Sequence, residues 1–255
     1  MNIKHITCSD PRNHNTYEEL FGLCKMDPRV EIAVQMHPGK VSPDTERYKW
    51  IKQLVDMMSD SITIQDVCNL AIHVNNDWCD DICNGTVPVA LQPLFNADRW
   101  YEQHMTRLQP VVKRIQLNMP QKTADNFNAH KLKTLIEYYE DKDFIIQYNA
   151  RTQNAVQQLH KIGAKFSLLF DASGGRGESP KSWQKPVYPY FHPQGYSGGM
   201  SPENVADNLT KINSVAYTHD IWIDAEGKLK TDDKFDPKRA AEYIKNTLAW
   251  EQKHR

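Results

Sequence analysis

The sequence predicts a single-domain (β/α)8 barrel of the TIM type, and three observations support this fold class. Short apolar runs with β-branched residues recur eight times along the chain, and most of them precede a segment with helical periodicity. Strands that alternate with helices form a parallel sheet, and eight such units close that sheet into a barrel. A length of 255 residues suits one such barrel, so we expect one domain over residues 1–255.

The eight expected strands are read from apolar runs such as VEIAVQM, DFIIQY and FSLLFD. They cover residues 3–8, 30–36, 69–74, 111–117, 143–148, 166–171, 193–198 and 220–225. The expected helices cover residues 16–25, 45–58, 129–140, 152–163, 203–212 and 237–250. Three pairs place a capping side chain before a proline and predict helix starts: Ser42–Pro43, Ser201–Pro202 and Asp236–Pro237.

Two features of the connections complete the expected architecture. Residues 79–110 are long for one connection between a strand and a helix, so we expect an elaborated loop region there. An open doubly wound sheet is the competing fold, and it would be favoured by a glycine fingerprint after the first strand. The segment ITCSDPRNHN contains no glycine, which favours the barrel.

Composition narrows the class of protein. Acids and bases nearly cancel to a net charge of -1, which gives no reason to expect a nucleic-acid or membrane partner. The N-terminus becomes polar too early for a signal peptide, and no apolar run approaches the roughly 18 residues of a membrane span. The cysteine count of 5 is odd and suggests reduced thiols. We therefore expect a cytoplasmic protein, a monomer or homodimer.

The ends of the expected strands carry the candidate catalytic groups, because active sites of such barrels gather at the C-terminal ends of the strands. Asp171 ends an apolar strand, where desolvation favours a protonated carboxyl that can act as an acid. Cys8 ends the first strand and can act as a base if its thiolate is stabilised. The alternative roles are a small buried side chain for Cys8 and a turn cap for Asp171.

Glycines mark two expected loops at the same end of the barrel. Three glycines within residues 174–177 follow Asp171 and let the backbone approach a ligand closely. Gly198 and Gly199 run into the expected helix start at Ser201–Pro202, so their amides and the helix N-terminus can hold a phosphate. A tight turn is the alternative reading of this Gly-Gly pair.

Three stretches of the sequence resemble the phosphoribosylanthranilate isomerase family. They are LLFDASGGRGESPKSW, GYSGGMSPENVADNL and IWIDAEGKLKTDDKFDPKRAAEYI, and the similarity is strongest over residues 166–247. The family catalyses an Amadori rearrangement of tryptophan biosynthesis, which needs an acid to open the sugar ring and a base to remove the C2 proton. The resemblance implies Asp171 as the acid, Cys8 as the base and no cofactor.

The resemblance also implies the residues that hold the substrate, a small phosphorylated sugar. The substrate-binding residues are Lys40, Gln116 and Asp224, and the phosphate-binding residues are Gly175, Gly198, Gly199 and Gly227. For Asp224, a helix cap or a surface acid is the alternative role.

The sequence departs from the family pattern at several positions, which include Arg176 and Lys181 in the loop after Asp171. Glu226 stands where the family has serine, and its carboxylate would repel a phosphate unless the side chain points away. The arginine with which the family binds the anthranilate carboxylate is absent from HPGKVSP, and Lys40 is its possible substitute as a point charge. Asn118 stands where the family has a histidine after the fourth strand. Three readings stay open: a divergent isomerase on the usual substrate, an enzyme for a different phosphorylated aminosugar or metabolite, and a non-catalytic binding or assembly module.

Overall fold

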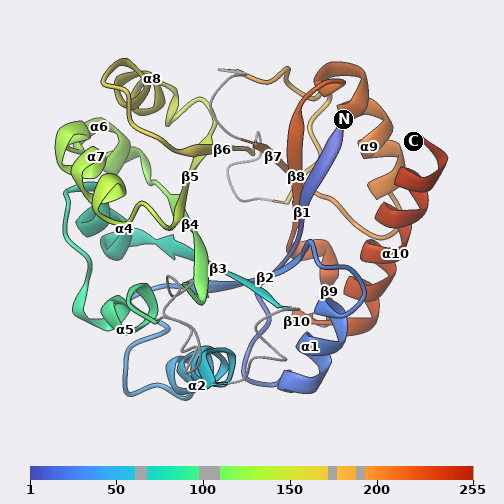
Figure 1. Ribbon diagram of the computed structural model, residues 1–255, viewed down its shortest axis with the longest axis horizontal. Helices are drawn as coiled ribbons and strands as arrows, with labels where there is room; N and C mark the ends of the chain where they lie inside the picture. Colours follow the sequence, from blue (N-terminus) through green and yellow to red (C-terminus); the bar gives the residue numbers. More distant parts are fainter. Residues whose placement is uncertain (61–67, 98–109, 172–176, 188–192, 255) are drawn as a thin grey trace, which may run out of the picture.

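A computed structural model describes residues 1–60, 68–97, 110–171, 177–187 and 193–254. Eight parallel strands follow the order of the chain and close into one barrel, in which β8 pairs with β1 (Figure 1). The strands are β1 (Asn2–Ser9), β2 (Val30–Met36), β3 (Asn69–Asn75), β4 (Val112–Asn118), β5 (Asp143–Tyr148), β6 (Ser167–Phe170), β7 (Gln194–Ser197) and β8 (Asp220–Ala225). The predicted single-domain barrel is confirmed, and every predicted strand overlaps an observed one.

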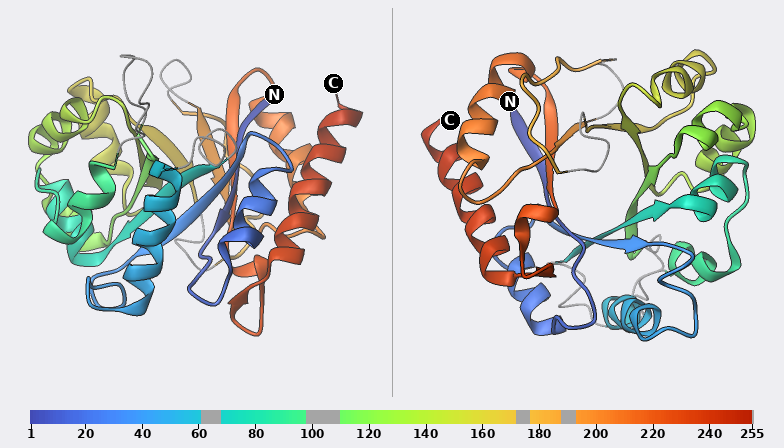
Figure 2. Two further views of the ribbon diagram at one scale, coloured as in Figure 1. Left: turned by 60° about the horizontal axis from the view of Figure 1, so that its bottom comes forward. Right: turned by 180° about the vertical axis from the view of Figure 1, so that it is seen from behind.

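Helices surround the barrel, and the two termini lie on the same side of it (Figure 2). The α-helices are α1 (Tyr17–Cys24), α2 (Glu46–Asp60), α4 (Asn76–Cys83), α5 (Gln92–Phe95), α6 (Gln121–Asn126), α7 (Ala129–Tyr138), α8 (Gln153–Lys161), α9 (Val205–Ala216) and α10 (Pro237–Lys253). The shorter elements are the 3-10 helices η1 (Val89–Leu91) and η2 (Gly227–Leu229) and the paired strands β9 (Lys230–Thr231) and β10 (Lys234–Phe235). The expected loop region at residues 79–110 thus includes helices, while residues 98–109 lie outside the described residues.

The predicted helix starts differ in outcome. Helix α10 begins at Pro237 as expected, and the Asp236 side chain accepts hydrogen bonds from the amides of Lys238 and Arg239. Helix α2 begins at Glu46 rather than directly after Ser42–Pro43. A capping side chain before proline therefore marks the neighbourhood of a helix start without setting its first residue.

The predicted start at Ser201–Pro202 is wrong by three residues, since α9 begins at Val205. The Asn204 side chain accepts a hydrogen bond from the Ser201 amide at 2.8 Å and donates one to the Gly199 carbonyl oxygen at 2.9 Å. These two bonds hold residues 199–204 in a turn, because an asparagine side chain can replace the backbone contacts of a first helical turn.

The barrel interior is filled near its middle by apolar side chains. Ile145, Leu169 and Trp222 form a cluster of their own, separate from the core between strands and helices. Gly195 on β7 makes room for this cluster, since a Cβ atom there would lie 2.2 Å from Cε2 of Trp222. This packing separates the two ends of the barrel.

Towards the N-terminal ends of the strands, the interior contains buried charges. Arg114 on β4 pairs with Glu31 on β2 at 2.8 Å, and their side chains are 4% and 1% exposed. Thr7 donates a further hydrogen bond to Glu31, and the Arg114 guanidinium lies 4.2 Å from the ring centroid of Trp222. The hydrogen-bonded pair occupies this end of the interior.

Candidate active site

A cavity of about 150 Å³ opens at the C-terminal ends of the strands. Strands β2 to β8, or the residues directly after them, supply its walls. It is lined by Gln35, His73, Gln116, Asn118, Gln147, Leu169, Asp171, Gly177, Ser197, Gly198, Gly199, Met200, Asp224, Ala225, Glu226, Gly227 and Lys228. The polar side chains converge because residues at every second position of a strand share one face.

Asp171 lies in this cavity, directly after β6. It is 4% exposed, and one of its carboxylate oxygens accepts a hydrogen bond from Nε2 of Gln147 on β5 at 2.8 Å. The parallel pairing of β5 with β6 brings the two side chains to the same end of the barrel. Asp171 is thereby held with its carboxylate at the cavity wall.

Asp224 lies in the same cavity, on β8. It is 7% exposed and accepts a hydrogen bond from Oγ of Ser9 on β1 at 2.6 Å. Burial raises the pKa of Asp224 to about 7, because loss of water disfavours the ionised form. The hydrogen bond from Ser9 opposes this shift, while the charges of Glu226, Glu31 and Asp171 add to it. A carboxyl with this pKa exchanges protons readily near neutral pH.

The structure does not bring Cys8 and Asp171 together. Thr7 pairs with Asp224 and hydrogen-bonds Glu31, which places Thr7 on the inner face of β1. Cys8, one residue further, takes the outer face and is fully buried in the core between strands and helices. Burial raises the pKa of its thiol, so the thiolate form is disfavoured. Neither its position nor its pKa suits the role of a base in this cavity.

Gly198 and Gly199 line the cavity after β7 and both adopt positive φ angles, of 114° and 61°. A Cβ atom at Gly199 would lie 2.6 Å from the backbone nitrogen of Ser179, so the turn packs closely against residues 177–179. Among the described residues, the two glycine amides donate no backbone hydrogen bond. The turn therefore fits both the tight-turn reading and an anion site.

The remaining predicted phosphate and substrate residues have different outcomes. Gly227 and the exposed Lys228 line the cavity after β8, whereas Gly175 lies outside the described residues. Gln116 lines the cavity and donates to Oδ1 of Asn118 at 2.8 Å. Lys40 is exposed and is not part of the cavity wall.

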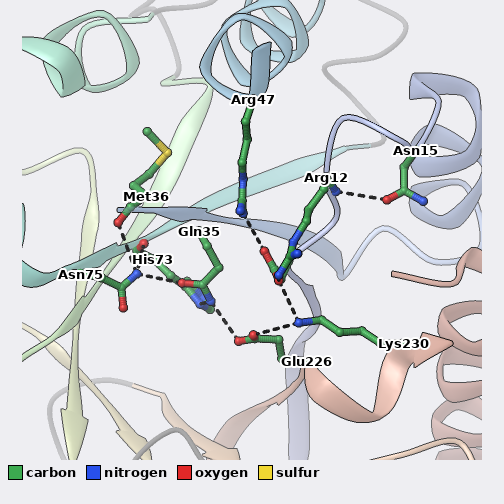
Figure 3. A network of polar contacts seen from close by, with 10 residues as sticks. Arg12, Asn15, Gln35, Met36, Arg47, His73, Asn75, Glu226 and Lys230 are labelled. Carbon is green, nitrogen blue, oxygen red and sulfur yellow. Dashed lines mark hydrogen bonds and ion pairs between the residues drawn. The ribbon is translucent and has the colours of Figure 1, made fainter. Parts of the chain in front are cut away.

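Glu226 points across the mouth of the barrel towards β2 (Figure 3). Its carboxylate accepts a hydrogen bond from Nε2 of Gln35 at 2.9 Å and lies 3.4 Å from Nζ of Lys230. Burial raises the pKa of Glu226, and the charge of Asp10 raises it further, while Lys230 opposes the shift. Glu226 is thus held in the cavity wall by residues from two other elements.

Sequence reasoning missed several groups of the site. Gln147 orients Asp171 and Ser9 holds Asp224, yet neither was a candidate. His73 lines the cavity floor at 2% exposure, and burial lowers its pKa to about 4, so it is neutral at neutral pH. The period of two along each strand is the signal that could have found them, because each lies on the inner face of a strand, within one residue of a predicted strand end.

Comparisons with known proteins give the fold. No protein-family model matches the sequence, and no curated protein does either. The chain is similar to phosphoribosyl anthranilate isomerase from Thermococcus kodakaraensis, with 13% identity and a TM-score of 0.50 over 96% of this chain and 99% of that one. It is also similar to N-(5'-phosphoribosyl)anthranilate isomerase from Pyrococcus furiosus, with 13% identity and a TM-score of 0.52 over 96% and 98% of the two chains. Both likenesses support the barrel fold.

The part of the chain that the structure describes lacks two kinds of feature. None of the helices in that part of the chain is long and apolar enough to cross a membrane. Likewise, no group of three or more His, Cys, Asp or Glu side chains is arranged there to hold a metal ion.

Proposed function

We propose that this chain is an isomerase that converts an aldose into a ketose by acid and base catalysis. Its substrate would be a small phosphorylated sugar with an amine at C1, and the reaction would be an Amadori rearrangement. The supporting observation is that Asp171 and Asp224 line one cavity beside the Gly198–Gly199 turn. This arrangement supplies two titratable groups to a single substrate.

Asp224 would act as the acid. It donates a proton to the ring oxygen, the bond between C1 and that oxygen breaks, and an open-chain iminium ion forms. A pKa of about 7 leaves much of Asp224 protonated at neutral pH, and the hydrogen bond from Ser9 to Oδ1 leaves Oδ2 for the transferred proton.

Asp171 would act as the base. It takes the proton from C2, and the electron pair of that C–H bond forms the C1=C2 bond of an aminoenol. Return of a proton to C1 and loss of the C2 hydroxyl proton then give the aminoketose. The hydrogen bond from Gln147 holds the Asp171 carboxylate in position for this step. In this proposal the pair of Asp171 and Asp224 replaces the pair of Asp171 and Cys8.

The phosphate would bind between the loops after β7 and β8. Barrels of this kind often bind phosphate there. The amides of Gly198 and Gly199 can donate to it, and Gly227 and Lys228 line the opposite side of the same opening. Glu226 points towards Gln35 rather than towards this turn, which reduces the repulsion expected from its carboxylate.

Phosphoribosylanthranilate is the first substrate to assay, since the stretches of residues 166–247 resemble its isomerase, an enzyme of tryptophan biosynthesis. A different phosphorylated aminosugar is the second candidate. Two observations favour it: Lys40 lies outside the cavity, and Glu226 lies in its wall.

The test measures two signals on wild-type protein. Turnover of phosphoribosylanthranilate is followed by the loss of anthranilate fluorescence, and removal of the C2 proton is followed by deuterium incorporation from D2O in NMR spectra. We expect Asp171→Asn and Asp224→Asn each to reduce turnover by at least about 10²-fold, the usual contribution of one acid or base. Glu242→Gln on the exposed face of α10 is the charge-matched control and should keep full activity.

Two results would contradict the proposal. The first is full activity in both aspartate variants. The second is binding of a phosphorylated sugar amine by the wild type with neither turnover nor deuterium exchange at micromolar enzyme, which would support a non-catalytic module.

A further inference from the structure

The wall of the cavity opposite the Gly198–Gly199 turn is built from hydrogen-bonded side-chain amides. Gln116 donates to Asn118 at 2.8 Å, Asn118 donates to Asn75 at 3.0 Å, and Asn75 donates to Gln35 at 2.9 Å. Gln35 then donates to Glu226 at 2.9 Å. The chain of donors crosses from β4 to β2 in one direction and ends on a carboxylate.

This series of hydrogen bonds between side-chain amides fixes the orientation of Glu226. The Gln35 amide oxygen is occupied by Asn75 and its nitrogen by Glu226, with Nδ1 of His73 at 3.3 Å from the same nitrogen (Figure 3). A side chain held from both ends loses little further freedom when a ligand binds, so its charge is preorganised. Glu226 therefore presents a carboxylate at a defined place in the cavity wall.

The cation next to Glu226 is shared with another acid. Lys230 lies 2.8 Å from Asp10 and 3.4 Å from Glu226, and Asp10 also binds Arg12 at 2.7 Å and Arg47 at 2.6 Å. Lys230 thus binds Asp10 more closely than Glu226. Since the Glu226 side chain is 43% exposed and lines the cavity, its carboxylate can still receive a donor from a ligand.

The charges of the cavity wall decide which ligand is favoured. Asp171, Asp224 and Glu226 contribute carboxyl groups, and Lys228 is the cation among the described lining residues. A carboxylate on the ligand, placed near Glu226, would face like charge, whereas an ammonium group would meet an oriented acceptor. The neutral His73 at the floor does not alter this balance.

We propose that Glu226 is a specificity-determining residue that receives the C1 nitrogen of the reacting sugar, which is cationic in the iminium ion and in the alkylammonium of the aminoketose product, and that disfavours an aromatic acid in its place. The substrate class is then a sugar phosphate with a free amine at the end of the carbon chain remote from the phosphate. This inference rests on the proposed function, which supplies the phosphate at the Gly198–Gly199 turn. The inference adds the group that the substrate carries at the end remote from the phosphate.

The experiment compares three stable ligands that share one five-carbon chain and one phosphate. They are ribitol 5-phosphate, 1-amino-1-deoxyribitol 5-phosphate and 1-(2-carboxyanilino)-1-deoxyribitol 5-phosphate, so that C1 carries a hydroxyl, an ammonium or an aromatic acid. Binding to the wild-type chain of 255 residues is measured by titration calorimetry. We expect the ammonium ligand to bind at least about tenfold more tightly than the hydroxyl ligand, as one charge-assisted hydrogen bond allows, and the aromatic acid to bind most weakly.

Two variants test the residue itself. In Glu226→Gln, the ammonium ligand should lose its advantage and bind like the hydroxyl ligand, whose affinity should change by less than about threefold. Glu242→Gln, which removes the same charge from the exposed face of α10, should leave all three affinities unchanged.

The outcomes separate this inference from the proposed function. Equal affinities of the hydroxyl and ammonium ligands for the wild type would overturn the role of Glu226 and leave a sugar-phosphate site intact. Tightest binding of the aromatic acid would also overturn it and would favour phosphoribosylanthranilate as the substrate. Binding of none of the three would contradict both. The wild-type comparison decides these cases even if Glu226→Gln fails to fold.

Discussion

We compare the unfolding free energy of Asp224→Asn with that of the wild type. The variant should gain more stability relative to the wild type at alkaline pH than at acid pH. The folded state raises the pKa of Asp224 to about 7 from an ordinary value of 3.8. Folding therefore favours the protonated carboxyl. The stability that comes from this protonated carboxyl is complete below the pKa of Asp224 in the unfolded state. It is lost as the pH rises through the pKa of Asp224 in the folded state.

The magnitude follows from the two pKa values. Each pH unit between them corresponds to about 1.4 kcal/mol, so the raised pKa lowers the unfolding free energy, relative to its value with a fully protonated carboxyl, by about 4.3 kcal/mol at pH 8 and about 1.7 kcal/mol at pH 5. Asparagine does not titrate. The change in unfolding free energy caused by Asp224→Asn should therefore be more favourable at pH 8 than at pH 5 by about 3 kcal/mol. Any constant penalty, such as an amide nitrogen without an acceptor, cancels in this difference.

Urea denaturation of both proteins at pH 5 and pH 8, followed by circular dichroism, provides the measurement. Titration of groups that do not interact with residue 224, such as His73, is common to the two proteins and also cancels. An identical stability difference at the two pH values would refute the raised pKa. It would also remove the reason for assigning the acid role to Asp224, whose replacement should reduce turnover by at least about 10²-fold.

The remaining predictions concern Cys8 and Gly195. Cys8→Ala should keep turnover within about twofold of the wild type, because the thiol is packed on the outer face of β1 and away from the cavity. Loss of this packing should lower the unfolding free energy by about 1 kcal/mol. A large loss of turnover in a folded variant would restore Cys8 as a catalytic group. Gly195→Ala should lower the unfolding free energy by about 1–3 kcal/mol or more. The new methyl group would lie 2.2 Å from the Trp222 ring and 2.6 Å from the Leu169 side chain. An unchanged melting temperature would show that this part of the interior is loosely packed.

Much of the fold can be predicted from the sequence, because a unit of one strand and one helix repeats along the chain. Apolar runs such as residues 143–148 must be buried on both faces, and helical segments such as residues 237–250 bury one stripe, so their alternation specifies a closed parallel sheet. The same reasoning correctly places Asp171, Asp224 and Gly198 at one end of the barrel, since parallel strands all end at one edge. These inferences need only the order of elements along the chain.

Other features of the site depend on contacts that no local pattern reveals. A shift of one residue reverses the face of a strand, and the boundaries of β1 are not known to one residue from the sequence; Cys8 was therefore expected inside the barrel although Ser9 takes that place. The direction of Glu226 is set by Lys230 and by Gln35, which lies 191 positions away along the chain. The amino-acid order by itself determined the barrel and the end at which its acids meet. Only the tertiary structure decided which side chains hold Asp171 and Asp224, which thiol faces the helices and where Glu226 points, because these depend on register and on partners distant in the chain.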